Sequence, residues 1–530
     1  MTFVQFHFLV FLIITVAVFY ICPVKYRWIV LLGASIVFYA IAGIKYLPFI
    51  FVTSFSVYLA GRKMGAIYAA QEQECSAPGL DRKAKKALKE QAKARCRKVL
   101  ILLLVLNVGI MCVCKFMKFF VEPINQLVMH VNGQASFTAE MIIVPLGISY
   151  YTFTSLSYLL DVYWKRISYE KNYARFLLYV SYFPHILQGP IERYGRLGER
   201  LKAELRFDYT RVAMGVQLMV WGFIKKLILA NRLDTFITGT FNRYAEVGGF
   251  AFWVAALLDV VYIYADFSGC MDIARGVSQI FSVELDLNFD HPFSSKSVTE
   301  FWRRWHMTMG GWFREYVYLP LSSSGLVKKI SKSTKNRMPD RVARVLVTAI
   351  PVSVTWVLTG LWHGTGKTYL SWGIYYAFLI LMSVCFGDDL HQLAVKAKVN
   401  TESASWKLFQ MARTTCIFMF GRLLTRPDGL WKTKIVIKSM FTDYNPWVLF
   451  DGTLYRFGFT RQDMSVTLFF IALFGVVSFY ELRYGSVREW IAKQGVVFRY
   501  AVWLLAVLAV IVLGVYGPGF NAASFAYMAF

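Results

Sequence analysis

The stretches SVTEFWRRWHMTMGGWFREYVYLPL (297–321) and TWVLTGLWHGTGKT (355–368) are the parts of this sequence from which the rest can be interpreted. Two of the seven histidines, His306 and His363, lie in them, each directly after a tryptophan. An imidazole can take a proton from a hydroxyl group near neutral pH, because its unperturbed pKa is about 6.5. The two stretches are therefore the first candidates for a catalytic centre.

The sequence around them has the composition of a membrane protein. Of the 530 residues 57% are hydrophobic, whereas soluble domains reach about 45–50% with glycine included. Segments such as Phe3–Cys22 and Tyr500–Tyr516 contain no Lys, Arg, Asp or Glu, and a helix needs roughly 20 predominantly apolar residues to cross a bilayer. The sequence predicts an all-α polytopic membrane protein. With no repeat or soluble domain evident, residues 1–530 are expected to form one domain.

The net charge of +26 is explained by basic loops and does not indicate that the protein binds nucleic acid. Residues 62–98 hold eleven Lys and Arg against four acidic residues, and such loops stay in the cytoplasm. No aromatic residue interrupts the basic run 82–98, so a surface for stacking bases is not expected. With this loop inside, residues 121–141 form an external loop, both termini lie outside, and residues 517–530 form an external tail. The eight cysteines include no CxxC pair, and no metal site is expected.

The first stretch predicts a helix that starts with a capping box at Ser297–Glu300, in which serine and glutamate each bind a free backbone N–H group. The spacing of Trp302, Trp305, His306 and Met309 places these side chains on one face of that helix. A buried imidazole that bonds only to the backbone is the alternative to a functional His306.

His363 ends the apolar run 345–362 and is followed by Gly364 and Gly366. Ionisable groups within membrane segments are costly and are functional by default. The glycines would allow close approach of the backbone and leave the ring facing a cavity. A structural histidine is again the alternative.

Two other apolar segments are interrupted and are expected to line an interior site. Residues 142–163 contain Pro145 and Gly147, and residues 173–189 contain Pro184 and His185 towards their end. Breaks in a helix at membrane depth are tolerated only where protein or a water-filled cavity covers the freed backbone groups.

Six sequence motifs between Val144 and Gly364 together resemble those of the membrane-bound O-acyltransferase (MBOAT) superfamily, and more narrowly its bacterial polysaccharide O-acetylation branch. They occur in the expected order: VPLGISYYTF (144–153), FPHILQGPIERYGRL (183–197), YADFSGCMDIA (264–274), NFDHPF (288–293), FWRRWH (301–306) and LWHG (361–364). The resemblance is weaker towards both ends, so residues 144–364 are expected to be the catalytic core.

The resemblance implies a ring of about ten to twelve transmembrane helices plus re-entrant segments around a thinned centre. It implies that His363 is catalytic, as general base on the attacking hydroxyl, and that His306 is its essential partner. His306, or a donor near it, would polarise the thioester carbonyl or orient the donor. Six further side chains are candidates for binding substrate: Asp266, His185, Arg303, Trp302, Trp305 and Trp362.

The function implied is transfer of an acyl group, most simply acetyl, from a cytoplasmic thioester to an extracellular or cell-wall polysaccharide. Acetyl-CoA is the expected donor, with no tightly bound cofactor, and an external SGNH-type acetyltransferase is the expected partner in a bacterial cell membrane. D-alanyl transfer to teichoic acid from a carrier protein is the alternative within this class. A transporter or flippase is the alternative from another class; it would predict inverted repeats, and no such symmetry is found in the sequence.

The last six residues, FAYMAF (525–530), have the spacing FxYxxF. They resemble the C-terminal motif of a small partner protein in teichoic-acid D-alanylation, in which the tyrosine is proposed to carry the acyl group. Tyr527 is therefore a candidate catalytic acyl relay. An aromatic anchor at the membrane interface is the alternative.

Overall fold

The computed structural model describes residues 2–132, 144–335 and 337–516, and the regular elements within these ranges are helices. Nine helices in the described ranges are long and apolar enough to cross a membrane, and Phe6–Ile21 is a shorter apolar helix. The prediction of an all-α polytopic membrane protein is confirmed, while the number of crossings stays a prediction. The chain forms two compact units, one of residues Met1–Gly215 with Val277–Asp286 and one of Val216–Gly276 with Leu287–Phe530.

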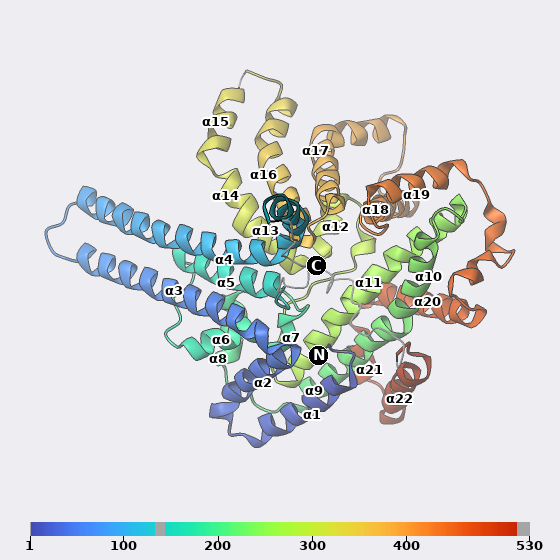
Figure 1. The fold of residues 1–530 in the computed structure, drawn as a ribbon, viewed down its shortest axis with the longest axis horizontal. Helices are drawn as coiled ribbons and strands as arrows, with labels where there is room; N and C mark the ends of the chain where they lie inside the picture. The colour runs from blue at the N-terminus through green and yellow to red at the C-terminus, as the bar shows by residue number, and fades with distance from the viewer. Residues whose placement is uncertain (1, 133–143, 336, 517–530) are drawn as a thin grey trace. The chain divides into compact units, whose positions relative to one another are not determined.

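The first unit is built from the N-terminal helices (Figure 1). Their bounds are α1 (Phe6–Ile21), η1 (Val24–Tyr26), α2 (Arg27–Ala42), η2 (Ile44–Tyr46), α3 (Leu47–Cys75), α4 (Arg82–Asn132), α5 (Ile148–Tyr163), α6 (Tyr173–Ser181), α7 (Phe183–Ile186), η4 (Tyr194–Gly198) and α8 (Glu199–Lys202). The helix α9 (Tyr209–Phe223) then carries the chain into the second unit.

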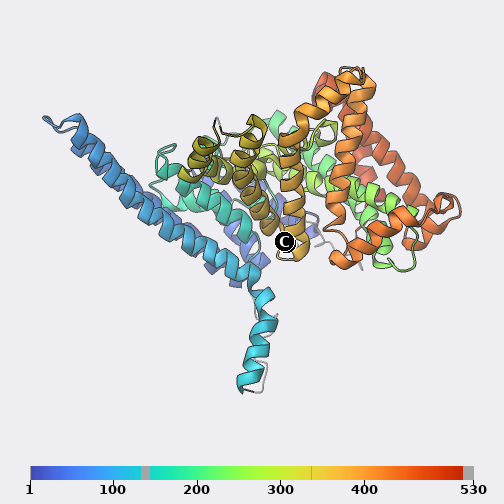
Figure 2. The same cartoon turned by 90° about the horizontal axis from the view of Figure 1, so that it is seen from above.

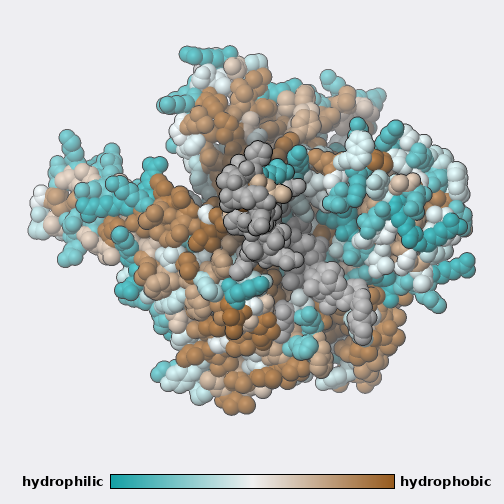
Figure 3. Space-filling model, viewed as in Figure 1, coloured by the Kyte–Doolittle hydropathy of each residue, from teal (hydrophilic) through white to brown (hydrophobic). Residues whose placement is uncertain are grey.

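The basic loop expected at residues 62–98 is a helical hairpin, because α3 and α4 run side by side past the apolar part of the unit (Figures 1 and 2). Hydrophilic residues cover its far end, and hydrophobic residues cover the part nearer α5 (Figure 3). The first part of the expected external loop at 121–141 is helical, since α4 continues to Asn132 beyond the candidate membrane span, which ends at Met117. Its position outside the membrane stays a prediction. Residues 133–141 lie outside the described residues.

The interrupted segments of the first unit are largely buried, and that they line an interior site stays a prediction. The helix α5 begins after Gly147, whose φ of 71° is left-handed, and a Cβ atom there would overlap the carbonyl oxygen of Ile186. Only glycine fits this position. Glu192 is fully buried and accepts the N–H group of Asp286 at 2.6 Å.

The second unit holds the remaining helices, and α11 contributes many residues to its hydrophobic core. Their bounds are η5 (Ile224–Ala230), α10 (Asn231–Asn242), α11 (Gly249–Ile280), η6 (Pro292–Ser294), α12 (Val298–Arg304), α13 (Met307–Phe313), η7 (Arg314–Tyr318), α14 (Leu319–Ser322), α15 (Gly325–Thr334), α16 (Asp340–His363), α17 (Lys367–Lys396), α18 (Ala404–Leu423), α19 (Leu430–Thr442), η8 (Pro446–Leu449), η9 (Thr453–Phe457), α20 (Arg461–Tyr484), α21 (Val487–Ala492) and α22 (Val496–Leu513).

Glycine residues set the spacing between two helices that meet at residues 355–368, one of which ends there while the next begins. The helices α16 and α17 pack along each other. A Cβ atom at Gly360 would overlap the carbonyl oxygen of Tyr369, and one at Gly373 would meet the carbonyl oxygen of Trp356. The two backbones therefore approach more closely than larger residues would allow, which fixes the end of α16 against the first turns of α17.

Candidate active site

The helix that leads to His306 begins as predicted but is much shorter. Ser297 Oγ accepts the N–H group of Glu300 at 3.1 Å, as in a capping box. Glu300 Oε2, however, accepts the N–H group of Lys296 at 2.9 Å, where the box requires that of Ser297. The helix α12 ends at Arg304.

The prediction that Trp302, Trp305, His306 and Met309 share one helix face is wrong, because the helix breaks between them. Trp305 is extended and pairs in an antiparallel bridge with Phe289. His306 has a left-handed backbone with φ 47° and ψ 50°, and α13 starts after it. A left-handed residue other than glycine costs of order 1–3 kcal/mol and persists only where its surroundings impose it.

The side chain of Asn288 fixes the orientation of the His306 ring. Asn288 Oδ1 accepts the backbone N–H of Thr308 at 3.0 Å and its hydroxyl at 2.9 Å. His306 Nδ1 lies 3.3 Å from the same oxygen. Because a backbone N–H can only donate, this Asn288 atom is the acceptor, and His306 Nδ1 carries the proton that it donates.

His306 is therefore a neutral imidazole with its proton on Nδ1. The side chain is fully buried, and this burial lowers the pKa of His306 to about 3. A neutral ring with its proton on Nδ1 has a lone pair on Nε2, so it offers no N–H there to a substrate carbonyl. This geometry suits a ring that orients a substrate or its partner histidine.

His363 is the last residue of α16, and 5% of it is exposed. The chain turns away at Gly364, where a Cβ atom would overlap the ring of Tyr369. The expected close approach of the backbone after His363 is thus found, and glycine is the residue that permits it. The ring of Trp372 lies edge-on to the imidazole with its centroid 5.1 Å away.

The structure brings the two histidines together. Their ring centroids are 6.5 Å apart. Trp362 lies beside both, 4.9 Å from His363 and 6.0 Å from His306, and Phe267 lies edge-on to His306 at 4.7 Å. Aromatic rings therefore hold both imidazoles in place within the second unit.

His363 lines a cavity of about 30 Å³ in this unit. A water molecule needs roughly 10–15 Å³ by this measure, so the space holds one or two waters or a small substrate group. The lining residues are Ile263, Trp302, Trp305, His363, Tyr369, Trp372, Phe418, Arg422 and Thr425. The imidazole thus faces a cavity that several hydrogen-bonding side chains also line.

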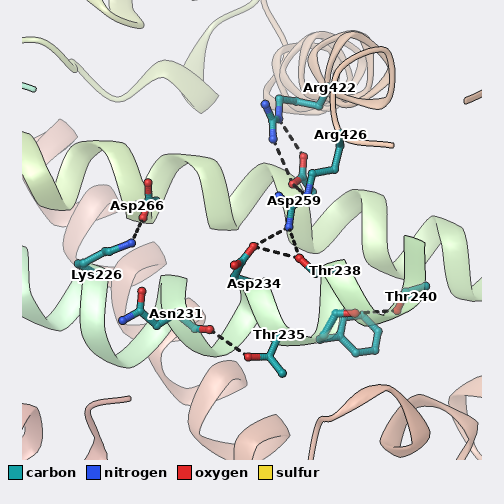
Figure 4. Close-up of polar contacts among 11 residues, drawn as sticks. Lys226, Asn231, Asp234, Thr235, Thr238, Thr240, Asp259, Asp266, Arg422 and Arg426 are labelled. Atoms are coloured by element: carbon teal, nitrogen blue, oxygen red, sulfur yellow. Dashed lines mark hydrogen bonds and ion pairs between the residues drawn. The ribbon is translucent and has the colours of Figure 1, made fainter. Parts of the chain in front are cut away.

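Of the other predicted substrate-binding residues, some line the cavity and others do not. Trp302 and Trp305 line the same cavity as His363. Arg303 is exposed on α12. Asp266 is buried on α11 and forms an ion pair with Lys226 (Figure 4), so its charge is balanced within the protein.

Two predicted residues belong to the other unit or lie outside the described residues. His185 belongs to the first unit, is buried, and donates Nε2–H to the carbonyl oxygen of Tyr179 at 3.0 Å. This is the arrangement of a structural histidine. Tyr527 lies outside the described residues.

Four residues near the two histidines were not predicted from the sequence: Asn288, Arg422, Tyr369 and Trp372. Asn288 opens the motif NFDHPF, so its position in a quoted motif was a usable signal. Arg422 lies on α18, far along the chain from His363, and nothing local marks it. Within the described ranges no group of three or more His, Cys, Asp or Glu side chains could hold a metal ion.

Comparison with known proteins gives a consistent result. The model of the MBOAT, membrane-bound O-acyltransferase family, matches residues 42–334. The chain is 28% identical to the probable alginate O-acetylase AlgI of Pseudomonas syringae pv. tomato, over 89% of this chain and 81% of that protein. It is 26% identical to the peptidoglycan O-acetyltransferase of Helicobacter pylori, over 66% and 62%. It is 31% identical to the teichoic acid D-alanyltransferase of Bacillus subtilis, over 44% and 58%.

Proposed function

Because the chain belongs to the membrane-bound O-acyltransferase family, we propose that it moves an acetyl group from a cytoplasmic thioester to a hydroxyl group of an extracellular or cell-wall polysaccharide. The observation that carries the proposal is the position of His363, which lines a cavity and lies beside a second imidazole that contacts Asn288. The family match favours an acyltransferase over the transporter alternative.

In the proposed reaction, His363 takes the proton of the attacking hydroxyl group. The oxygen forms a bond to the thioester carbonyl carbon, the carbon–sulfur bond breaks, and the leaving thiolate takes the proton from His363. His306 keeps its proton on Nδ1 throughout the reaction and donates it in a hydrogen bond to Asn288. Its role is to hold the geometry of the site. No metal ion takes part in this scheme.

Acetyl-CoA is the donor in this proposal, and it binds as a substrate rather than as a resident cofactor. The names of the AlgI and peptidoglycan relatives support acetyl as the group transferred. D-alanyl transfer from a carrier protein is the second candidate, and it is supported by the match to the teichoic acid enzyme, which covers 44% of this chain.

The proposed setting is a bacterial cell membrane with the basic end of the α3–α4 hairpin in the cytoplasm and both chain termini outside. The excess of Lys and Arg in residues 62–98 supports this orientation. Tyr527 would then lie on the side of the polymer and could carry the acetyl group to an external SGNH-type acetyltransferase. Intact mass after incubation with acetyl-CoA, comparing wild type with Tyr527→Phe, tests this step: an added acetyl group on both proteins would refute it.

Donor turnover by the purified protein tests the function. The protein in lipid nanodiscs is given acetyl-CoA labelled in the acetyl group, or a carrier protein loaded with D-alanine, and release of CoA or free carrier is measured. The proposal predicts turnover of acetyl-CoA. Turnover of the D-alanyl carrier alone would establish the second candidate, and turnover of neither would refute acyl transfer from these donors.

A further inference from the structure

Among the side chains that line the cavity beside His363, three tryptophans and Arg422 can only donate hydrogen bonds. An indole offers one N–H group, and a guanidinium offers five, and neither has an acceptor atom. Trp302 and Arg422 both line the cavity. Among the residues that the structure describes, Trp302 Nε1 is buried and has no hydrogen-bond partner. A buried donor without a partner is costly, which points to an oxygen atom that it binds during function.

Arg422 is held rigidly by a chain of alternating charges (Figure 4). Its Nε and Nη2 lie 2.8 Å and 3.2 Å from the two oxygens of Asp259, a two-point contact that fixes the plane of the guanidinium. Arg426 Nε lies 3.3 Å from Asp259, and its Nη2 lies 2.6 Å from Asp234. The chain Asp234–Arg426–Asp259–Arg422 therefore presents its positive end to the cavity, where negative charge is favoured.

We propose that the Arg422 guanidinium and the Trp302 indole N–H form an oxyanion-binding pair. When the hydroxyl oxygen attacks the thioester, the carbonyl π electrons move onto the carbonyl oxygen, and these two donors stabilise that charge. The electrons return to re-form the carbonyl as the carbon–sulfur bond breaks. This inference rests on the proposed acyl transfer. It assigns the hydrogen-bond donors that stabilise the oxyanion in that reaction.

The hydrogen bonds of His306 support the assignment. His306 Nδ1–H donates a hydrogen bond to Asn288 Oδ1. The neutral ring therefore has no N–H group on Nε2 to offer an oxyanion. Arg422 stays charged at any working pH, and its position is set before substrate binds. A donor fixed in advance is the arrangement that lowers a transition-state barrier most effectively.

The test compares kcat and KM for acetyl-CoA turnover in Arg422→Gln, Trp302→Phe and a control. Loss of one oxyanion donor lowers kcat by about 10²–10³-fold, and we expect this in both variants with KM within about threefold of wild type. Trp302→Phe keeps an aromatic ring and removes only the N–H group, so it serves even if Arg422→Gln fails to fold. Arg413→Gln, an exposed arginine on the same helix α18, should leave kcat unchanged.

A purely structural role for Arg422 makes a different prediction. The double variant Arg422→Gln with Asp259→Asn removes both charges of the pair and leaves no buried carboxylate without a partner. If this protein is folded and regains wild-type kcat, the inference is overturned. It is also overturned if Trp302→Phe and Arg422→Gln both keep wild-type kcat while wild type and Arg413→Gln turn over acetyl-CoA, an outcome that leaves the proposed function intact. If wild type itself turns over no thioester, the inference falls together with the function.

Discussion

Replacing Asn288 by alanine tests whether the orientation of His306 matters to the chemistry. Asn288 Oδ1 accepts two hydrogen bonds from Thr308 and one from His306 Nδ1. The alanine variant leaves the His306 Nδ1–H group without its acceptor in a fully buried site. The ring is then free to turn or to move its proton to Nε2.

The magnitude follows from the hydrogen bond that is lost. A buried donor without a partner costs about 1–3 kcal/mol, and this energy would no longer favour the productive ring position. If that energy is lost from the transition state, the rate falls by roughly 5- to 150-fold. The Thr308 N–H group is half-buried and regains part of its bonding from water, so its contribution is smaller.

The assay is acetyl-CoA turnover by the purified variant, with the thermal midpoint measured in parallel. Asn288→Asp keeps an acceptor oxygen at the same place and should retain more activity than Asn288→Ala. Asn400→Ala removes the side chain of an exposed asparagine in the same unit and should behave as wild type. A folded Asn288→Ala protein with wild-type kcat would refute the claim that this oxygen holds His306 for catalysis.

Three further outcomes are expected. Asp266→Ala removes the carboxylate that is ion-paired with the buried Lys226 and should destabilise the protein by about 3–5 kcal/mol, whereas Lys226→Met with Asp266→Leu should be close to neutral in thermal unfolding; equal loss in both would contradict this. Burial raises the pKa of Glu192 to about 7, so the stability that the protonated carboxyl retains below about pH 4.5 is lost as the pH rises towards 7. Glu192→Gln should then raise the thermal midpoint at pH 8 and change it little at pH 5. A larger gain at pH 5 than at pH 8 would contradict the predicted pH dependence. Gly364→Ala should lower kcat more than tenfold through its overlap with Tyr369, and unchanged turnover would show that this contact does not position His363.

The features that depend on residues close together in the sequence were predictable. Apolar length marked the membrane helices, and two histidines after tryptophans in an apolar chain marked the site that the structure brings together. Gly364 was expected to permit close approach of the backbone, and the Tyr369 ring occupies the space that a Cβ atom would need.

The elements that depend on distant contacts were not predictable. The helical spacing from Trp302 to Met309 was real, but the bridge between Trp305 and Phe289 interrupts the helix, because hydrogen bonds to a segment earlier in the chain replace those within the helix. The place of Arg422 depends on its contact with Asp259 on another helix, and no spacing along the sequence encodes such a pair.

Turnover of labelled acetyl-CoA by purified His363→Ala protein tests the central claim most directly. The account predicts that the variant reaches wild-type levels in the membrane, is monodisperse after purification, and releases CoA at the rate of the buffer alone, while wild type turns over. Release of CoA at the wild-type rate by the folded variant would contradict it.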